Sequence, residues 1–143
     1  MENLTLIKDE DRKDFLPRHF GFKNDFVVFE SGLYTLMEMN STEYKGGYWQ
    51  FYETDSGAPI LLLNKKGTFE VVSKSNFFQG SMDIGVYSAA TTTLVTNLMS
   101  ARAHERGDEE ATDQYAAYYF LQMDWARRSL SKDDLLSFEA FLD

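Results

Sequence analysis

Several residue types that define common protein classes are absent or scarce in this sequence. There is no cysteine, which excludes disulfide bonds, thiol catalysis and metal sites built on thiolates. There are only two prolines, and no tract rich in proline, glycine or serine marks a linker between domains. No apolar run approaches the ~20 residues that cross a bilayer, and the acidic N-terminus lacks the basic and then apolar plan of a signal peptide. We therefore expect a soluble cytoplasmic protein without membrane contact.

Basic residues are also few. The sequence has 14 lysines and arginines against 23 aspartates and glutamates, which gives a net charge of -9. Because nucleic-acid binding relies on clustered lysine and arginine to displace counterions from phosphates, we expect no direct contact with nucleic acid. The acidic surface either faces a basic groove on another protein or serves only to keep the chain soluble.

Hydrophobic residues, in contrast, are sufficient for a packed core. They make up 43% of the 143 residues, and aromatic residues alone make up 15%. A chain of this length has the size of one ordinary domain, and it contains no internal repeat. We expect a single domain over residues 1–143, present as a monomer.

Apolar residues recur at helical spacing in four segments of the chain. The predicted helices cover residues 25–40, 84–106, 108–128 and a short segment from 132 onwards. A shorter helix before Pro17 should end or bend near Leu16, because proline disfavours helical geometry in the residue before it.

Capping residues mark where these helices begin and end. Asn24 or Asp25 can cap the first long helix, and Ser81 or Asp83 the second. The remaining boundaries fall at Gly107, Asp108 and Ser131.

Between the first two long helices, aromatic and branched apolar runs predict strands. They cover residues 48–53, 60–63 and 69–72, and the turns between them are a few residues long. Because short connections join antiparallel neighbours, we expect a three-stranded antiparallel meander, followed by an irregular segment over 75–82. The predicted fold class is α+β: a small antiparallel β-sheet of three or four strands packed with four to five α-helices in a single domain.

Two blocks of the sequence combine several uncommon residue types. Residues 15–21 read Phe-Leu-Pro-Arg-His-Phe-Gly, and residues 44–53 read Tyr-Lys-Gly-Gly-Tyr-Trp-Gln-Phe-Tyr-Glu. With two weaker segments, 30–37 and 76–80, they resemble in order and spacing the plasmid antirestriction protein family typified by ArdB and KlcA. The resemblance implies relief of type I restriction-modification by non-enzymatic interference. The implied partner is the host type I restriction-modification machinery or an associated host factor, and no catalytic residue, metal or cofactor is carried over.

His19, beside Arg18, is the candidate for acid-base chemistry. It is either a hydrogen-bonded structural histidine or the catalytic group of a small hydrolase that pairs it with a carboxylate such as Glu53. Neither His19 nor His104 has metal-site spacing to a second ligand, and no Gly-x-Ser-x-Gly nucleophile motif is present.

The aromatic strand offers a second candidate surface. Alternation along a strand places Trp49 and Phe51 on one face and Tyr48 and Tyr52 on the other. Stacking on bases would need flanking lysines and arginines, and only Lys45 is near. We expect one face in the core and the other partly exposed as a protein-contact surface, because tyrosine and tryptophan are enriched at interfaces.

Acidic residues gather between Glu105 and Asp113. They either imitate DNA phosphates and occupy the DNA channel of a restriction or methylation enzyme, or stabilise a helix N-terminus, where each acid contributes ~0.3–1 kcal/mol. The candidate interaction residues are therefore Arg18, His19, Tyr48, Trp49, Tyr52, Glu109 and Glu110.

Overall fold

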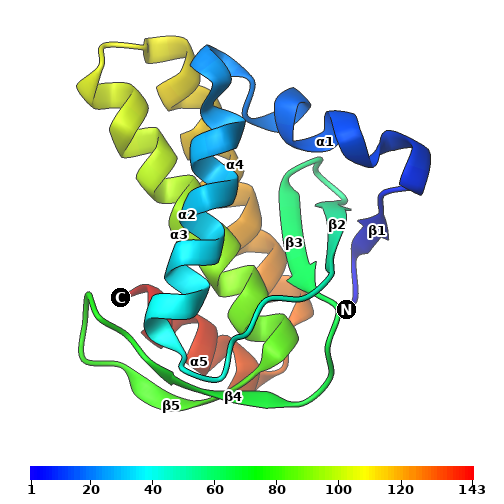
Figure 1. Cartoon of the computed structure of the whole chain (residues 1–143), viewed down its shortest axis with the longest axis vertical. Coiled ribbons are helices and arrows are strands. Elements are labelled where there is room, and N and C mark those ends of the chain that lie inside the picture. Colours follow the sequence, from blue (N-terminus) through cyan, green and yellow to red (C-terminus); the bar gives the residue numbers. More distant parts are fainter.

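Three long helices lie beside one another, with one sheet against them and a β-hairpin across one end (Figure 1). The computed structural model describes residues 1–143. The α-helices are α1 (Arg12–His19), α2 (Asp25–Asn40), α3 (Ile84–Glu105), α4 (Glu109–Ser129) and α5 (Lys132–Leu142), and short 3-10 helices cover Asp9–Asp11 and Phe22–Asn24. The strands are β1 (Leu4–Leu6), β2 (Trp49–Thr54), β3 (Pro59–Leu63), β4 (Thr68–Val72) and β5 (Gln79–Asp83). None of the helices combines the length and the hydropathy required to span a membrane.

The strands form two separate antiparallel sheets. The first has the order β1-β2-β3, with Trp49 paired to Leu63, and the second is the β4-β5 hairpin. The α+β fold class and the number of helices are therefore confirmed. Of the predicted meander, the antiparallel pairing of the first two strands is confirmed. The pairing of the third strand is wrong, because β4 pairs with β5 and not with β3. The irregular segment predicted over 75–82 is also wrong in its second half, which forms most of β5, and β1 was not predicted.

Helix α3 explains why β3 has no second neighbouring strand. The Thr92 hydroxyl accepts a hydrogen bond from the Leu61 amide at 3.3 Å and lies 3.1 Å from the Leu61 carbonyl oxygen. The Ser88 hydroxyl accepts from the Leu63 amide at 3.1 Å. Because these side chains satisfy backbone groups on the free edge of β3, α3 takes the place of a fourth strand. The chain after β3 therefore leaves the first sheet and forms the separate β4-β5 hairpin.

The N-terminal half of helix α3 is buried on nearly all sides although it is rich in serine and threonine. Thr91, Thr92 and Thr93 are all 0% exposed, and each hydroxyl donates to the carbonyl oxygen four residues earlier. Such local bonds satisfy a hydroxyl without a partner from another element. Polar residues can therefore occupy the centre of this fold.

The predicted helix boundaries at Asp83, Asp108 and Ser131 are confirmed, since each side chain accepts a backbone amide at the start of α3, α4 or α5. The predicted cap of α2 is wrong. Asn24 has a left-handed backbone with φ of 59° and makes no side-chain cap bond. The Asp25 carboxylate bonds instead to the turn between α3 and α4. The Asp25 side chain, which the local sequence pattern offered as a cap, therefore forms an ion pair with the distant Arg106 instead.

Helix α1 does not end near Leu16, which was one of the two predicted outcomes, but continues through Pro17 to His19. Proline removes one amide bond, to the carbonyl of Lys13, and that residue is exposed, so water can take its place. The side chains of Phe15, Leu16 and His19 are buried. Tertiary packing therefore holds the last turn of this helix against the preference of the proline.

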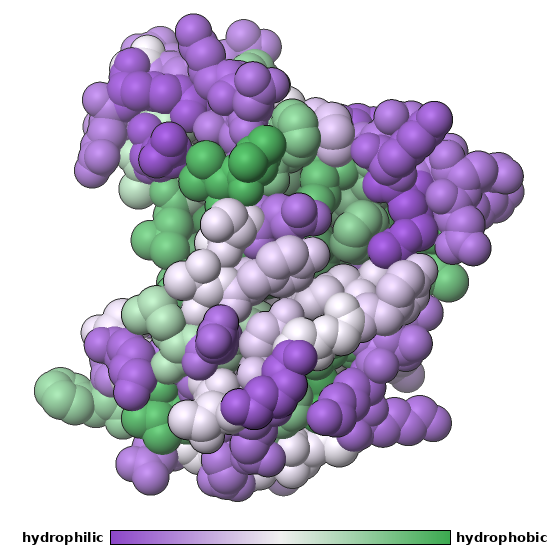
Figure 2. All heavy atoms as spheres, in the orientation of Figure 1, coloured by the Kyte–Doolittle hydropathy of each residue, from purple (hydrophilic) through white to green (hydrophobic).

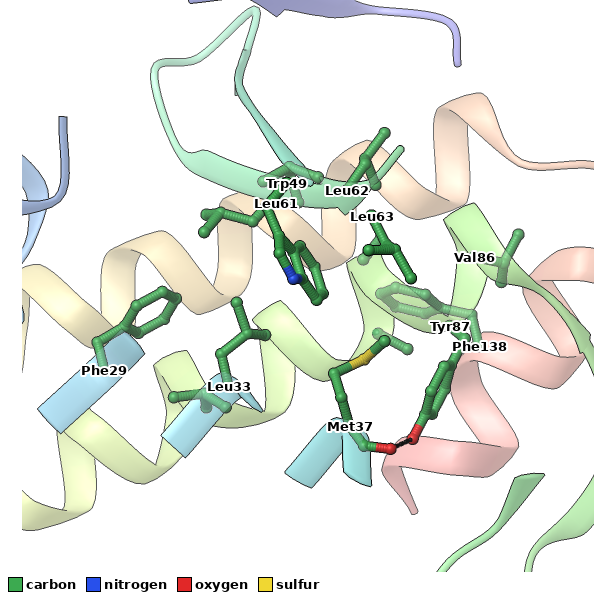
Figure 3. Close-up of a cluster of buried hydrophobic side chains, with 14 of the residues drawn as sticks. Phe29, Leu33, Met37, Trp49, Leu61, Leu62, Leu63, Val86, Tyr87 and Phe138 are labelled. Carbon is green, nitrogen blue, oxygen red and sulfur yellow. Dashed lines mark hydrogen bonds between the residues drawn. The ribbon is translucent and has the colours of Figure 1, made fainter. Parts of the chain in front are cut away.

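The main core lies between the long helices and the first sheet. Figure 3 shows Phe29, Leu33 and Met37 of α2 on the side of the helix that faces Trp49 of β2. Tyr87 of α3 is fully buried, and its hydroxyl donates to the Met37 carbonyl oxygen at 2.8 Å. This packing fixes the C-terminal half of α2 beside the start of β2.

Candidate interaction site

Helix α1 runs along strand β2 and is held to it at several points. Near the start of the helix, Arg12 donates to the Trp49 carbonyl oxygen at 2.9 Å. In the middle, the rings of Phe15 and Phe51 stack with their centroids 5.1 Å apart. At the end of the helix, His19 reaches the C-terminal half of β2. The two sequence blocks singled out above are therefore packed against each other.

His19 is the centre of a hydrogen-bonded network. Its Nε2 lies 2.6 Å from Glu53 Oε2, and its Nδ1 lies 2.8 Å from the hydroxyl of Tyr118 on α4. Arg18 donates to the same Glu53 oxygen at 3.1 Å. A neutral imidazole satisfies both contacts, because Nε2–H donates to the carboxylate and Nδ1 accepts from the phenol. The network joins α1, β2 and α4.

The pairing of His19 with Glu53 that a hydrolase would use is thus present, but it is shielded. His19 is only 6% exposed, and both of its ring nitrogens are occupied. A general base needs a nitrogen within reach of the substrate proton. Four surface hollows, with volumes from about 320 to about 780 Å³, are lined by other residues. The geometry fits a structural histidine better than an acid-base group.

Acidification is expected to destabilise the protein through His19. Burial lowers the pKa of His19 below its ordinary value of 6.5, although the hydrogen bond and charge of Glu53 act in the opposite direction. The folded state therefore binds the proton more weakly than the unfolded chain does. The stability that results is complete above about pH 6.5 and is lost as the pH falls through the lower pKa of the folded state.

The measurement is urea unfolding at about pH 7.5 and about pH 5.5, with His19→Gln removing part of the pH dependence. The matched control is His104→Gln, which replaces an exposed histidine and should keep the wild-type pH dependence. An unchanged pH dependence in His19→Gln would show that this network does not titrate.

The side chains of β2 alternate as predicted. Trp49 and Phe51 are 4% and 8% exposed and belong to the core, whereas Tyr48 is 54% exposed and Tyr52 is half-buried. The Tyr48 ring lies under the guanidinium of Arg12, 4.8 Å from its centre. Of the aromatic candidates, Tyr48 and Tyr52 therefore lie on the accessible surface, and Trp49 lies behind it.

A groove of about 780 Å³ lies between the C-terminal half of α2 and the segment leading into β2. It is lined by Tyr34, Glu38, Ser41, Thr42, Tyr44, Lys45, Gly46, Gly47 and Trp49. Sequence reasoning did not find this groove. The α2 residues in it were assigned only to a helix, and the loop that faces them has no periodic pattern from which its path could be predicted.

The acidic candidates lie in a different part of the molecule. Glu109 and Glu110 are exposed in the first turn of α4, beside the yellow turn between α3 and α4 in Figure 1 and away from β2. Nearby, Arg106 bonds both Asp25 at 2.7 Å and Asp108 at 3.1 Å. A surface hollow beside Arg106 and Glu109 is also lined by two further basic residues, Lys23 and Arg102. Basic side chains therefore interrupt the acidic array.

Hydrophobic atoms are also exposed over the upper part of the face shown in Figure 2. An apolar hollow of about 460 Å³ lies between α2 and α3, where Val27, Val28 and Leu98 are partly exposed. No charged residue lines this hollow. It therefore offers apolar area but no charge that would select a partner.

Known proteins are similar to this chain in sequence and in fold. A family model described as antirestriction protein matches residues 42–129. The chain is also 32% identical over 113 residues to the putative antirestriction protein YubI of Escherichia coli (strain K12), a match that covers 78% of each protein. This chain belongs to the antirestriction protein family.

A second antirestriction protein, KlcA of Escherichia coli, is 24% identical over 118 residues, which cover 82% of this chain and 81% of KlcA. A solved structure from work on the KlcA and ArdB proteins superimposes with a TM-score of 0.80 at 22% identity, over 96% of this chain and 93% of that one. That work describes a novel fold and antirestriction activity against Type I DNA restriction systems in vivo but not in vitro. The antirestriction fold therefore extends over nearly the whole chain.

Some of the candidate residues lie within the region matched by the antirestriction family model, and others lie outside it. It includes the aromatic strand, the loop side of the groove, and Glu109 and Glu110, and it leaves Arg18 and His19 outside. The His19 network thus joins a helix before the matched region to a strand and a helix within it.

Proposed function

We propose that this antirestriction protein relieves type I restriction of incoming DNA without enzymatic activity, through contact with the host restriction-modification machinery or an associated host factor. Membership of the antirestriction family is the observation that carries this proposal. The fold shared with KlcA and ArdB supports it, because those proteins are described as active against Type I DNA restriction systems. We further propose that the protein acts as a cytoplasmic monomer and does not bind nucleic acid directly.

The description of KlcA and ArdB as active in vivo but not in vitro bears on the mode of action. An inhibitor that filled the DNA channel of the restriction enzyme would also act on the purified enzyme. An inhibitor that works through another host component would lose its effect on purification. We therefore favour protein contact that involves a host factor over direct occupation of the DNA channel.

The double variant Glu109→Gln, Glu110→Gln is expected to retain full antirestriction activity. A DNA mimic depends on dense, regular carboxylates that attract a basic channel, and here Arg106 and the bases beside it interrupt the array. The measurement is phage plating on a type I restricting host that expresses either protein. Loss of activity in the double variant, with salt-sensitive binding to the restriction enzyme, would favour the DNA-mimic alternative.

The direct test of the proposed function is the plating efficiency of unmodified phage on a type I restricting host, with and without expression of this protein. Expression is expected to raise plating on that host and to leave plating on a restriction-deficient host unchanged. Unchanged plating on the restricting host, with folded protein verified in the same cells, would refute the proposed function while leaving the family assignment intact.

A further inference from the structure

The groove between α2 and the loop before β2 combines aromatic rings with an unpaired carboxylate. We propose that this groove binds an arginine side chain presented by a segment of a partner protein. Only the identity of the partner, a component that acts in host restriction, rests on the function proposed above. The binding itself follows from the chemistry of the groove.

Three aromatic rings line the groove at inclined angles. The ring centroids of Tyr34 and Trp49 lie 6.0 Å apart, and those of Tyr44 and Trp49 lie 6.2 Å apart. The indole Nε1 of Trp49 donates to the Tyr44 hydroxyl at 3.2 Å, and this bond fixes the two rings relative to each other. A planar guanidinium stacks on aromatic rings and is less strongly hydrated than an ammonium group. Tyr34 is 37% exposed, against 8% for Tyr44 and 4% for Trp49. The exposed Tyr34 ring, packed beside this fixed pair, therefore favours arginine over lysine.

Glu38 supplies the negative charge of the groove. It is exposed, it lines the groove, and it forms no ion pair within the protein. Burial, with a smaller contribution from the charge of Glu30, raises the pKa of Tyr34 to about 12. The Tyr34 phenol therefore stays neutral at physiological pH. A guanidinium can donate two parallel hydrogen bonds to a single carboxylate, so Glu38 is free to receive an arginine.

The loop side of the groove offers main-chain donors. Gly46 and Gly47 have left-handed φ values of 82° and 138°, and a Cβ atom on Gly47 would lie 2.9 Å from Leu63 Cδ1, so the loop is pressed against β3. The backbone amides of Lys45, Gly46 and Gly47 donate no hydrogen bond within the protein. They can bond the carbonyl groups that flank the arginine, which favours a peptide segment as the ligand over the free amino acid.

Lys45 carries the opposite charge to Glu38, and its substitution distinguishes a cationic ligand from an anionic one. Its ammonium group repels a guanidinium, so its removal must not weaken the binding of an arginine peptide. If the groove instead recognised an anion, Lys45 would be the group that binds it. Charge changes at Glu38 and at Lys45 therefore have opposite predicted effects.

The experiment uses the whole purified protein and the peptide acetyl-Gly-Arg-Gly-amide. The matched control peptide has citrulline, the neutral analogue of the same shape, in place of arginine. Binding is followed by the NMR signals of the two indole N–H groups, since the chain has two tryptophans. Trp49 lies in the groove, whereas Trp125 is fully buried and bonds the Glu2 carbonyl oxygen, so it serves as an internal reference.

The Trp49 signal is expected to shift and saturate with the arginine peptide at a dissociation constant on the order of 1 mM, while the Trp125 signal stays in place. Citrulline should bind at least about tenfold more weakly, Glu38→Gln should weaken arginine binding by about tenfold, and Lys45→Gln should leave it equal or tighter. Equal binding of the two peptides, no shift of Trp49, or weaker binding in Lys45→Gln would overturn the proposal.

Phage plating separates this inference from the proposed function. If the peptide binds but the wild-type protein does not restore plating, the groove assignment stands and the proposed function fails. If plating is restored but the peptide does not bind, the proposed function stands and the groove assignment fails. If Glu38→Gln loses the peptide and keeps full plating, the groove does not serve antirestriction, and its partner is not a component of host restriction.

Discussion

Replacing Asp25 by alanine is expected to lower the free energy of unfolding by about 3–5 kcal/mol, because it removes one partner of a buried ion pair. The Asp25 side chain is 2% exposed and bonds Arg106 through two nitrogens, at 2.8 and 2.7 Å. The Tyr115 hydroxyl donates to the same carboxylate at 2.8 Å. The substitution therefore leaves the buried Tyr115 phenol without its acceptor and the Arg106 guanidinium with Asp108 alone, and it disconnects the start of α2 from α3 and α4.

Urea unfolding of the variant beside the wild type measures this loss. The matched control is Asp124→Ala, which removes an aspartate that also bonds an arginine, Arg128, but on the surface. Exposed pairs contribute about 0–1 kcal/mol, so the control should unfold close to the wild type. Equal losses in the two variants would mean that burial of Asp25 contributes nothing, and a loss under about 1 kcal/mol in Asp25→Ala would contradict the prediction.

Replacing Thr92 by valine should cost about 1–3 kcal/mol, although the two side chains have nearly the same shape. Valine cannot accept the hydrogen bond from the Leu61 amide. Thr92 is fully buried, so no water replaces its hydroxyl, and the free edge of β3 keeps an unpaired donor. The cost comes from that unpaired backbone group.

Thr93 provides the control for this substitution. It is equally buried, but its hydroxyl bonds only to the Ala89 carbonyl oxygen of its own helix. That carbonyl already accepts a helical amide, so Thr93→Val should be close to neutral. Unfolding both variants in urea compares the two environments directly. If Thr93→Val loses as much stability as Thr92→Val, the contact with β3 is not what makes Thr92 important.

The same two threonines show why the helices and the pairing of β2 with β3 could be predicted from the sequence, whereas the place of β4 in a second sheet could not. Helix spacing and N-caps such as Asp108 are local signals, and the structure follows them. On the free edge of β3, in contrast, the Leu61 amide donates its hydrogen bond to the hydroxyl of Thr92, which lies 31 residues later in the chain. No local pattern distinguishes Thr92, which bonds a strand, from Thr93, which bonds only its own helix. The meander was the natural prediction because short connections usually join neighbouring strands.

The candidate site was likewise predicted only in part. His19 and Glu53 were paired in advance because they are the histidine and a carboxylate of the two recognisable blocks, but Tyr118 lies 99 residues from His19 and carries no signal of its own. The groove beside Trp49 was missed because it depends on how an irregular loop folds back on α2. Individual residue types could be read from the sequence, whereas the contacts between distant elements could not.

The two residues just before β1 are bonded to α4, more than 120 residues later in the chain. The indole of Trp125 donates to the Glu2 carbonyl oxygen at 3.0 Å, and Asn3 donates to the Ser129 hydroxyl at 2.9 Å. Contacts between such distant residues form late, because a long loop must close before they can stabilise anything. During synthesis, β1 can therefore pair with β2 as soon as that strand is made, whereas Glu2 and Asn3 gain their partners only after α4 has been made.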